Sequence, residues 1–455
     1  MNTVIVGAGL AGLAAAHELN KAREKFLLFE KTDSVGGKLK TIQKEINSQN
    51  YSLDLGFQVI PSAYPSLQEI ISPDSFTKLN PCYFDSGAIL LRDGKSYSIG
   101  DPFQDASSLF DTLWNTLLNP LLSLEDKIRT LILRQELGKY SLQDILGGKP
   151  WQEQSALAFL QERRFSDLFL NNFAKPFFGG VFGDNSLGIR ASNFAFTLKA
   201  FSQGKVFIPA AGIQRLPELI AESLPKESIK LQTTATSIKA EENGKKLKVF
   251  LGSDKYVLVD AVILAVEPET LIEILGLTDL TETIKELIED LRSENSFRVK
   301  YHNLYFTSSI SLNIGKKIFL NCNPGALINN GVQISEIQKS RHNREEGQEH
   351  LISVTVLNSK VQSKNLPQTC IDELETLFPQ AKGQIKFLES FEIKEKNSLF
   401  QQNSANYERI GKLREAIMAK LPPNVFLAGE FMSENCSQEM SIQSGLQAAR
   451  KILGK

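Results

Sequence analysis

The N-terminal end of the chain combines a short strand, a glycine-rich turn and a helix, and this unit constrains the fold more than any other segment. The run Thr3–Val6 is apolar and rich in β-branched residues, which is typical of a buried strand. Gly7, Gly9 and Gly12 follow it directly, and Ala14–Ala16 then favour a helix. A strand that turns straight into a helix begins a βαβ unit, so the sequence predicts an α/β fold with a parallel sheet.

The glycines of this turn are spaced as in sites for dinucleotide phosphates. In a G-x-G-x-x-G unit, Gly7 permits the turn, Gly9 lets the backbone approach a diphosphate, and Gly12 allows close packing. A second buried strand, Phe26–Phe29, ends at Glu30, whose carboxylate can accept hydrogen bonds from ribose hydroxyls. A glycine turn that binds nothing is the alternative, but the strand–turn–helix context and Glu30 together favour a nucleotide site.

The residues after Glu30 distinguish a flavin site from a nicotinamide site. Gly36 and Gly37 are followed by Lys38 and Thr41. This pattern resembles the E-x5-G-G-[RK]-x-x-T element of FAD-dependent oxidoreductases with the amine oxidase fold, which include amine oxidases, protoporphyrinogen oxidase and phytoene desaturases. Paired glycines bring backbone amides up to the diphosphate, and the resemblance implies that Lys38 pairs with its charge. Most relatives carry Arg there, and Lys lacks the bidentate fork of Arg.

The C-terminal segment NVFLAGEFMSENCSQEMSIQSGLQAARKI is an independent match to the same superfamily. It predicts a buried strand, a turn at Gly429 and Glu430, a loop and a helix from about Met440. The resemblance implies that Glu430 hydrogen-bonds the ribityl chain and that amides at Met440, Ser441 and Ile442 face the N1/O2 edge of the flavin. A positive helix end there would stabilise the anionic reduced flavin. An ordinary amphipathic helix is the alternative.

A third match lies in the middle of the chain, where VFIPAAGIQRLPELIAESLP precedes several strand-like runs. It resembles the superfamily's P-x-G-G-x-x-x-L-P-x-x-L-A element and its β-meander, with Ala211 in place of the second glycine. Relatives contact adenine through the backbone at the position that matches Ala235. The strand Asp260–Val266 would return the chain to the nucleotide-binding sheet. The residues that the resemblance assigns to the cofactor are Gly7, Gly9, Ala11, Gly12, Glu30, Lys31, Gly37, Lys38, Gly56, Phe57, Ala235, Gly429, Glu430, Ser441 and Ile442.

The order of the three segments predicts a discontinuous, Rossmann-like FAD-binding domain. It would use residues 1–60, 204–290 and 405–455. A mostly helical block, 61–203, and a β-rich block, 291–404, lie between them and together would form a discontinuous α+β substrate domain. The expected fold class is therefore α/β with the amine oxidase fold, and catalysis is expected at the seam between the two domains.

Two shorter matches and one strand concern the substrate side. The segments LDLGFQVIPSAYP and NFAKPFFGGVFGD are similar to parts of phytoene dehydrogenase-like and amine oxidase-like enzymes, in which the first, with Gly56 and Phe57, runs beside the flavin ring. Amine oxidases often hold a lysine near flavin N5, through water, on a strand of the substrate sheet. In FRVKYHNLYF, alternation puts Lys300 on one strand face with His302 and Leu304. Lys300 is therefore the catalytic candidate, and a solvated strand lysine is the alternative.

The resemblance implies an FAD-dependent oxidoreductase in which hydride passes from substrate to flavin. The preferred function is dehydrogenation or desaturation of an apolar small molecule, carotenoid-like or tetrapyrrole-like. Flavin amine oxidation comes second, because only Phe400 and Tyr407 are aromatic where amine oxidases place an aromatic cage. An FAD-holding isomerase or a binding protein without redox turnover is the alternative of another class. The FAD is expected to be noncovalent, since Cys436 is out of register with the cysteine that relatives use.

One helical stretch carries a wide apolar stripe. Leu109, Leu113 and Leu117 step by four, and Ser123 with Asp126 predicts the N-cap of a second helix. Core packing is one interpretation of this stripe. In protoporphyrinogen oxidase and phytoene desaturase relatives the corresponding region touches membrane, so peripheral membrane contact through residues 107–137 is the other.

Composition limits other functions. The chain has 455 residues, of which 42% are hydrophobic and 23% charged, and its net charge of -1 gives no sign of a nucleic-acid partner. The four cysteines form no C-x-x-C pair, so neither a metal site nor a disulfide framework is predicted. No apolar run reaches ~18 residues, and Met1 nearly adjoins the first strand. We therefore expect a cytoplasmic protein, peripheral at a membrane at most, with a lipophilic or amphipathic substrate; the sequence does not predict its oligomeric state.

Overall fold

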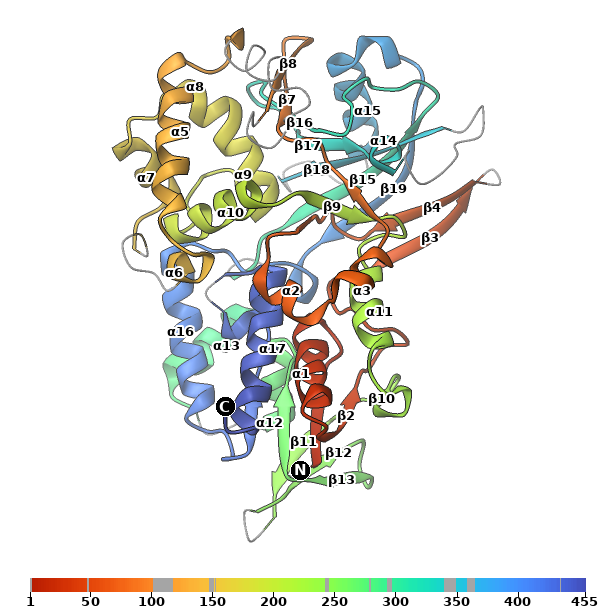
Figure 1. Ribbon diagram of the computed structural model, residues 1–455, viewed down its shortest axis with the longest axis vertical. Helices are drawn as coiled ribbons and strands as arrows, with labels where there is room; N and C mark the ends of the chain where they lie inside the picture. The colour runs from red at the N-terminus through yellow and green to blue at the C-terminus, as the bar shows by residue number, and fades with distance from the viewer. Residues whose placement is uncertain are drawn as a thin grey trace.

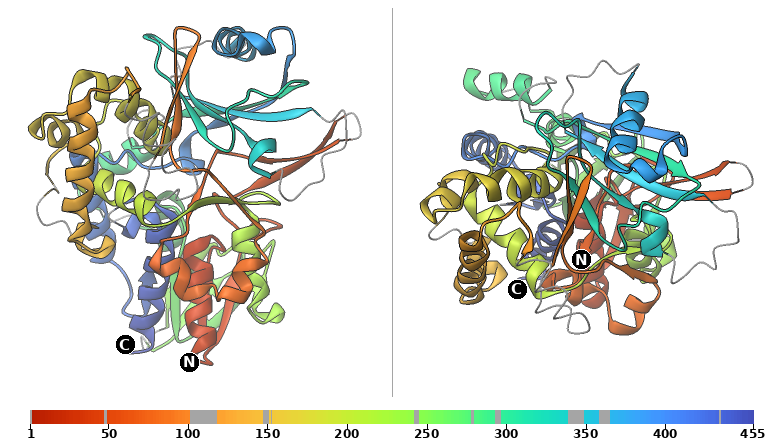
Figure 2. Two further views of the ribbon diagram at one scale, coloured as in Figure 1. Left: turned by 45° about the horizontal axis from the view of Figure 1, so that its top comes forward. Right: turned by 90° about the horizontal axis from the view of Figure 1, so that it is seen from above.

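The computed structural model describes residues 2–46, 49–100, 118–146, 151, 153–241, 245–277, 280–292, 297–338, 349–357, 365–433 and 435–455. Figure 1 shows a lower part that is built around a parallel sheet and holds both termini. The upper part combines a second sheet with a group of helices beside it. The two further views in Figure 2 show that these helices and the second sheet lie side by side above the parallel sheet.

Five parallel strands form the lower sheet in the order β10-β2-β1-β14-β20. The first strand is central, and its side chains alternate between two cores. Ile5 lies in the core under α1 and α17, whereas Val4 and Val6 lie in the core on the opposite face. The bounds are β1 (Asn2–Val6), β2 (Lys25–Phe29), β10 (Ile229–Lys230), β14 (Ala261–Leu264), β20 (Val425–Leu427), α1 (Leu10–Lys21) and α17 (Gln438–Ile452).

A three-stranded antiparallel sheet and three helices cover the opposite face of the parallel sheet. Ile238, Leu271 and Leu413 bring the sheet and two of these helices into the same core as Val4. The expected β-meander is therefore present. In the sequence it lies between two strands of the parallel sheet, β10 and β14. The bounds are β11 (Ser237–Ala240), β12 (Leu247–Phe250), β13 (Tyr256–Val259), α12 (Pro268–Leu275), α13 (Glu282–Arg292) and α16 (Ser404–Met418).

The upper sheet has seven strands in the order β19-β15-β18-β17-β16-β7-β8. Two of them, β7 and β8, come from the 61–203 block that was expected to be mostly helical. They form a hairpin because Asp93 and Gly94 both adopt positive φ, which a two-residue turn between strands requires. The bounds are β7 (Ala88–Arg92), β8 (Lys95–Ile99), β15 (Tyr301–Ser308), β16 (Ile318–Asn321), β17 (Ile328–Gln333), β18 (His350–Val356), β19 (Ile385–Ile393), α14 (Ile334–Gln338) and α15 (Leu366–Leu377).

The helical group begins with α5 (Leu124–Gly138), which has the predicted N-cap. Ser123 and Asp126 each accept a hydrogen bond from the backbone amide of the other, so this prediction is confirmed. The apolar leucines expected before position 118 lie outside the described residues. The other bounds are α6 (Leu142–Leu146), α7 (Ala156–Glu162), α8 (Asp167–Phe169), the π-helical turn η2 (Leu170–Ala174), α9 (Lys175–Phe182) and α10 (Ala191–Gln203).

Short elements connect the two parts. They include a two-stranded hairpin, β3–β4, which projects to the right in Figure 1, and a small sheet in the order β5-β9-β6. The bounds are β3 (Thr41–Ile46), β4 (Gln49–Asp54), β5 (Ile60–Pro61), β6 (Pro81–Tyr83), β9 (Val206–Pro209), α2 (Pro65–Ile70), α3 (Pro73–Thr77), α11 (Arg215–Glu222), η3 (Lys226–Ser228), η4 (Pro379–Ala381), η5 (Glu395–Asn397) and η6 (Glu430–Met432).

The base of the β3–β4 hairpin is tied to the turn before α11. The Thr41 hydroxyl donates to Asp54 Oδ1 at 2.6 Å, and the Ile213 amide donates to the same oxygen at 2.9 Å. Thr41 and Gln214 exchange two further hydrogen bonds. Gly212, with φ +95°, leaves room for Thr41, because a Cβ there would lie 2.4 Å from Thr41 Cγ2. These contacts give the threonine of the G-G-K-x-x-T pattern a structural role.

Helices α1 and α17 pack so closely that only glycine fits at the contact. A Cβ on Gly445 would lie 2.0 Å from the carbonyl oxygen of Ala11, and a Cβ on Gly12 would lie 1.9 Å from that of Gly7. Both obstacles are backbone atoms, which cannot move aside without shifting an element. Gly445 therefore lets α17 pack against the start of α1, and Gly12 lets α1 pack on the turn at Gly7.

We predict opposite effects from the same substitution at two helical glycines. Gly445→Ala forces α17 away from α1 and should destabilise the protein by about 1–3 kcal/mol. Gly411→Ala in α16 is the matched control, because nothing lies within 4 Å of a Cβ there. It should stabilise the protein by about 0.5–1 kcal/mol through helix propensity. Chemical denaturation of both variants measures this difference, and equal stability of the two would contradict the close packing.

A second prediction concerns pH. Burial raises the pKa of Asp54 to about 6, although hydrogen bonds from Thr41 and Ile213 act in the opposite direction. The folded protein therefore binds this proton more tightly than the unfolded chain, so the contribution of Asp54 to stability falls as pH rises from 3.8 to about 6. Asp54→Asn keeps the Oδ1 acceptor and removes the titration.

The free energy of unfolding of Asp54→Asn relative to the native protein should rise across this pH window, by up to about 3 kcal/mol, and stay level above it. Urea titrations in buffers that span the window measure the difference. A difference that does not vary with pH would show that the Asp54 carboxyl titrates normally.

Candidate active site

A cavity of about 960 Å³ lies between the parallel sheet and the upper part of the molecule. Its lower half runs between two glycine turns. Gly9 and Gly37 face each other there, and a Cβ on Gly37, which has φ +60°, would lie 3.2 Å from the Cα of Gly9. Gly429 adopts φ +113° and has no atom within 4 Å of a Cβ position. Bare backbone at Gly9, Gly37 and Gly429 leaves space along the start of α1, where helix amides favour an anionic group.

Most of the predicted cofactor residues meet at this cavity. Gly56 lines a smaller adjoining cavity of about 220 Å³ instead. Gly12 and Ile442 are not among the described residues that line either cavity, because Gly12 packs on the backbone of Gly7 and Ile442 is buried in the core. Direct cofactor contact by each residue stays a prediction. Those that line the large cavity are Gly7, Gly9, Ala11, Glu30, Lys31, Gly37, Lys38, Phe57, Ala235, Gly429, Glu430 and Ser441.

Glu30 is positioned by the turns around it. Its carboxylate accepts hydrogen bonds from the Ala8 amide at 2.8 Å and from the amide and hydroxyl of Thr32 at 2.9 Å. These bonds fix the carboxylate at the end of β2, on the edge of the cavity. The ends of β1 and β2 are thereby held together where the sequence predicts a ribose.

A partly buried ion cluster lies above the glycine turns and consists of Lys38, Glu267, Glu269, Arg298 and Glu430. Lys38 Nζ lies 2.5 Å from Glu430 and 3.1 Å from Glu267, and Arg298 lies 2.8 Å from Glu267 and 3.2 Å from Glu269. Burial acts to lower the pKa of Lys38, but Glu267 and Glu430 outweigh it and raise the pKa. Burial likewise acts to raise the pKa of Glu430, but Lys38 and Arg298 hold the pKa below its usual value. Lys38 and Glu430 therefore both stay charged at neutral pH.

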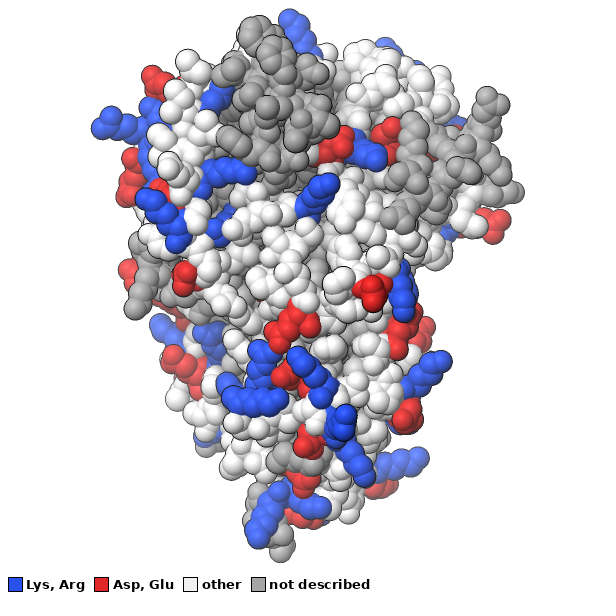
Figure 3. All heavy atoms as spheres, in the orientation of Figure 1, with Lys and Arg blue, Asp and Glu red and all other residues white. Residues whose placement is uncertain are grey.

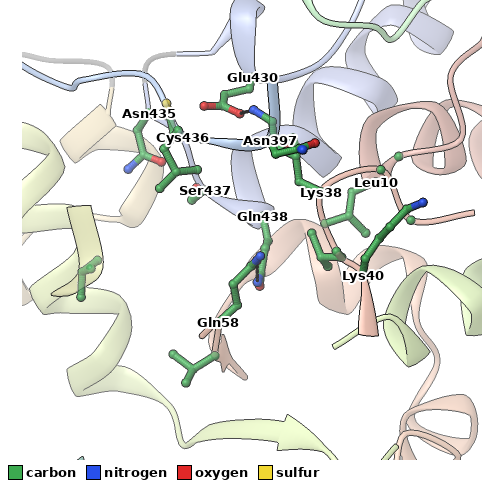
Figure 4. A pocket seen from close by; sticks show the side chains of 18 of the residues that line it. Leu10, Lys38, Lys40, Gln58, Asn397, Glu430, Asn435, Cys436, Ser437 and Gln438 are labelled. Atoms are coloured by element: carbon green, nitrogen blue, oxygen red, sulfur yellow. Dashed lines mark hydrogen bonds and ion pairs between the residues drawn. The ribbon is translucent and has the colours of Figure 1, made fainter. Parts of the chain in front are cut away.

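Neutral polar side chains surround the upper end of the cavity, near the start of α17 (Figure 4). Gln438 and Gln58 approach each other at 3.4 Å. The buried oxygens Asn435 Oδ1 and Gln438 Oε1 have no hydrogen-bond partner within the described part of the chain. Leaving a buried acceptor unpaired costs about 1–3 kcal/mol, so these oxygens fit a bound group with N–H or O–H donors. An isoalloxazine ring has such an edge, and the cavity therefore suits the predicted FAD.

Cys436 lines the same region but is poorly placed to react. Burial and the neighbouring Glu430 carboxylate raise the pKa of its thiol well above the usual value. Its sulfur donates weakly to the carbonyl oxygen of Phe400 at 3.9 Å. The protonated thiol is a poor nucleophile, which agrees with a noncovalent flavin.

The strand that carries the catalytic candidate presents a different residue to the cavity. Tyr301 lines both cavities, whereas Lys300 is not among the described residues that line either one. Tyr305 and Asn303, on the same strand face as Tyr301, bind the carbonyl oxygen of Asp54. A Cβ on Gly56 would lie 2.7 Å from the Tyr301 hydroxyl, so the glycine makes room for it. A catalytic role for Lys300 therefore stays an untested prediction without support from its position.

Burial raises the pKa of Tyr301 to about 12, so its hydroxyl stays protonated at neutral pH. Sequence reasoning missed this residue, because strand alternation alone cannot tell which face of β15 meets the cavity.

The wall that the helical group contributes is aromatic. Phe173 and Phe177 stack with ring centroids 5.3 Å apart, and Phe201 meets Phe177 edge-on at 5.8 Å. All three line the cavity. The π-helical turn η2 contains Phe173 and lies directly before α9, which contains Phe177. Such turns often occur at functional sites. This wall suits a flat apolar ligand.

Within the described residues, no group of three or more His, Cys, Asp or Glu side chains could hold a metal ion. None of the helices in the described ranges is long and apolar enough to cross a membrane. The four cysteines Cys82, Cys322, Cys370 and Cys436 are free thiols.

Two of the relatives found by sequence comparison match over short segments. A Drosophila melanogaster protein named "Possible lysine-specific histone demethylase 1" is 33% identical over 69 residues, 15% of this chain and 7% of that protein. The 1-hydroxycarotenoid 3,4-desaturase of Flavobacterium sp. (strain P99-3) is 28% identical over 148 residues, 30% of this chain and 29% of that enzyme. The matched segments thus span less than a third of either relative.

Structural comparison finds the same fold over the whole chain. One match is a structure from Exiguobacterium sp. 255-15 whose name gives it provisionally as a protoporphyrinogen oxidase. It is 17% identical to this chain, with a TM-score of 0.66, and the match covers 100% of this chain and 99% of that chain. A reduced UDP-galactopyranose mutase is 16% identical, with TM-score 0.66 and coverage of 100% and 95%. At this identity the likeness shows the fold alone, and it confirms the predicted amine oxidase fold.

The family of flavin-containing amine oxidoreductases matches residues 10–453, which is almost the entire chain. This match confirms the predicted FAD-dependent oxidoreductase and its noncovalent FAD. The glycine turns, the fixed Glu30 carboxylate and the unpaired oxygens at the upper end of the cavity fit that cofactor. The chain therefore belongs to the family of flavin-containing amine oxidoreductases.

Proposed function

We propose that this oxidoreductase dehydrogenates or desaturates an apolar small molecule, carotenoid-like or tetrapyrrole-like. The observation that carries the proposal is the aromatic wall of Phe173, Phe177 and Phe201 along the cavity. Aromatic faces bind flat or conjugated apolar groups by burial and stacking. The relative named as a 1-hydroxycarotenoid desaturase supports the same class of substrate.

When bound, FAD would supply the hydride acceptor for this dehydrogenation. The residues of the chain then have three tasks in this proposal. The glycine turns and Glu30 hold the nucleotide end, and the uncharged amides of Gln58, Asn435 and Gln438 orient the ring end. The phenylalanine wall excludes water from the reacting carbon atoms. The domain division at 1–60, 204–290 and 405–455 remains part of the proposal.

Amine oxidation is the second candidate, and the positions of two aromatic side chains count against it. Arg298 covers the ring of Phe400 at 4.2 Å, and Arg190 covers the ring of Tyr407 at 4.0 Å. Neither ring is among the described residues that line the cavity. Guanidinium groups thus occupy the aromatic faces that would otherwise attract a substrate ammonium group.

The test is anaerobic reduction of the flavin by a carotenoid-like polyene, a porphyrinogen and a primary amine. We expect a polyene or porphyrinogen to bleach the flavin and release a product oxidised by two electrons. Phe177→Ala should raise the KM for that substrate on the order of tenfold, because it removes one buried aromatic contact. Phe387→Ala is the control, since Phe387 is 43% exposed and is not among the described residues that line the cavity.

Reduction by the amine alone would favour amine oxidation. Conversion of a substrate without net oxidation would favour a flavin isomerase, for which the mutase of the same fold is a precedent. An unchanged KM in Phe177→Ala would remove the aromatic wall from the proposal.

We also propose a cytoplasmic enzyme that meets a membrane peripherally through residues 107–137, of which 118–137 are described. Leu124, Ile128 and Leu131 share one face of α5 and are 60%, 51% and 50% exposed. Ile132 is 58% exposed beside them, whereas Leu133 and Leu137 pack in the core. Figure 3 shows white surface in this region, with both blue Lys and Arg and red Asp and Glu side chains along it. The exposed apolar face of α5 suits a lipid surface.

Co-sedimentation with liposomes that contain anionic lipid tests this contact. We expect the native protein in the pellet and Ile128→Ser/Leu131→Ser in the supernatant. Leu258→Ser removes a comparably exposed side chain from β13 and should not change the result. Complete recovery of the native protein in the supernatant would refute the proposed contact.

A further inference from the structure

Lys38, which follows the paired glycines, already has a partner within the protein for each of its N–H donors. Lys38 Nζ lies 2.5 Å from Glu430 Oε2, 3.1 Å from Glu267 Oε1 and 3.0 Å from the carbonyl oxygen of Ser398. An ammonium group has three N–H donors, and these three acceptors match them. No donor of Lys38 is left for a phosphate oxygen in this arrangement.

The net charge of the ion cluster leads to the same conclusion. Lys38 and Arg298 face three carboxylates, those of Glu267, Glu269 and Glu430. The cluster therefore carries more negative than positive charge. A diphosphate that approached Lys38 would meet these carboxylates at close range, in a partly buried site where water screens less than at the surface.

Lys40 is the other cation that follows the paired glycines, two positions beyond Lys38, and it lines both cavities, whereas Lys31 at the start of the loop lines the large cavity alone. Figure 4 shows that Lys38 turns toward Glu430, whereas the side chain of Lys40 points away from Glu430. The side chain of Leu10, the first residue of α1, lies between them in this view. No ion pair of Lys40 is found within the described ranges. Lys40 thus remains available where the amides of α1 favour an anion.

We infer that the two lysines after the paired glycines, Lys38 and Lys40, have separate roles. Lys38 is a positioning residue that holds the carboxylate of Glu430 and the rest of the ion cluster in place, and Lys40 is the side-chain cation for the diphosphate of FAD. This differs from the role that the sequence resemblance implies for Lys38. It goes beyond the proposed substrate and does not rest on it, because it concerns only the nucleotide end of the site.

Two measurements on four variants test the inference: the melting temperature of the apoprotein, and the affinity for FAD at about 0.05 M and about 0.5 M NaCl. Lys38→Met should lower the apoprotein melting temperature on the order of 5 °C and leave the salt dependence of FAD affinity unchanged. Lys38→Arg should restore the melting temperature, because Arg also carries enough donors. If Lys38→Met does not fold, Lys38→Gln takes its place, since Gln keeps an N–H donor there.

Lys40→Met should leave the apoprotein melting temperature within about 1 °C of the native value. It should weaken FAD binding on the order of tenfold at low salt and much less at high salt, because salt screens the lost attraction. Lys412→Met, which removes an exposed lysine from α16, is the matched control and should change neither quantity.

The reverse pattern would overturn the inference. If Lys38→Met left the apoprotein unchanged and flattened the salt dependence, Lys38 would be the phosphate ligand. If Lys40→Met bound FAD like the native protein at both salt concentrations, Lys40 would have no role in the site. Neither measurement uses a substrate, so failure here is distinct from failure of the proposed reaction.

Discussion

Close backbone contact at glycine residues is the constraint on which the rest of this structure depends. Gly12 packs on Gly7, and Gly445 packs on Ala11, at separations where any Cβ would overlap a carbonyl oxygen. These contacts bring the start of the last helix beside the start of the first. Two helix N-termini then face one cavity, and both favour negative charge there. The two ends of the chain therefore build the cofactor site together.

The ion cluster joins this cofactor region to the upper sheet. Lys38 and Glu430 belong to segments around the parallel sheet, whereas Arg298 lies just before β15 of the upper sheet. Because both cations also bind the carbonyl oxygen of Ser398, the cluster fixes the chain where it passes between the two parts. The same contacts hold Glu430 at the cavity. The ion cluster thus fixes the two parts relative to each other and also holds Glu430 at the cofactor cavity.

Local signals in the sequence were sufficient for the parallel sheet and its glycine turns. The strand Thr3–Val6, the turn at Gly7 and the helix after it depend on neighbouring residues, and the N-cap at Ser123 does too. The hairpin at Asp93 and Gly94 also has a local signal, a D-G turn, although the 61–203 block was expected to be mostly helical.

Other features depend on contacts that no local pattern encodes. Lys38 and Glu430 are 392 positions apart, so the fold alone brings them together and occupies the donors of Lys38. Tyr301 rather than Lys300 faces the cavity because Asn303 and Tyr305, on the same strand face, bind Asp54 across the seam. The unpaired oxygens of Asn435 and Gln438 could not be recognised without the burial that isolates them.

The most direct test of the account is the absorbance spectrum of the purified protein before and after denaturation, with the released nucleotide identified by mass. The account predicts a flavin spectrum, FAD at about one per chain, and complete release into the supernatant on acid precipitation. A colourless protein that cannot take up FAD would show that the glycine turns no longer serve a cofactor. Flavin that stays with the polypeptide would contradict the noncovalent site.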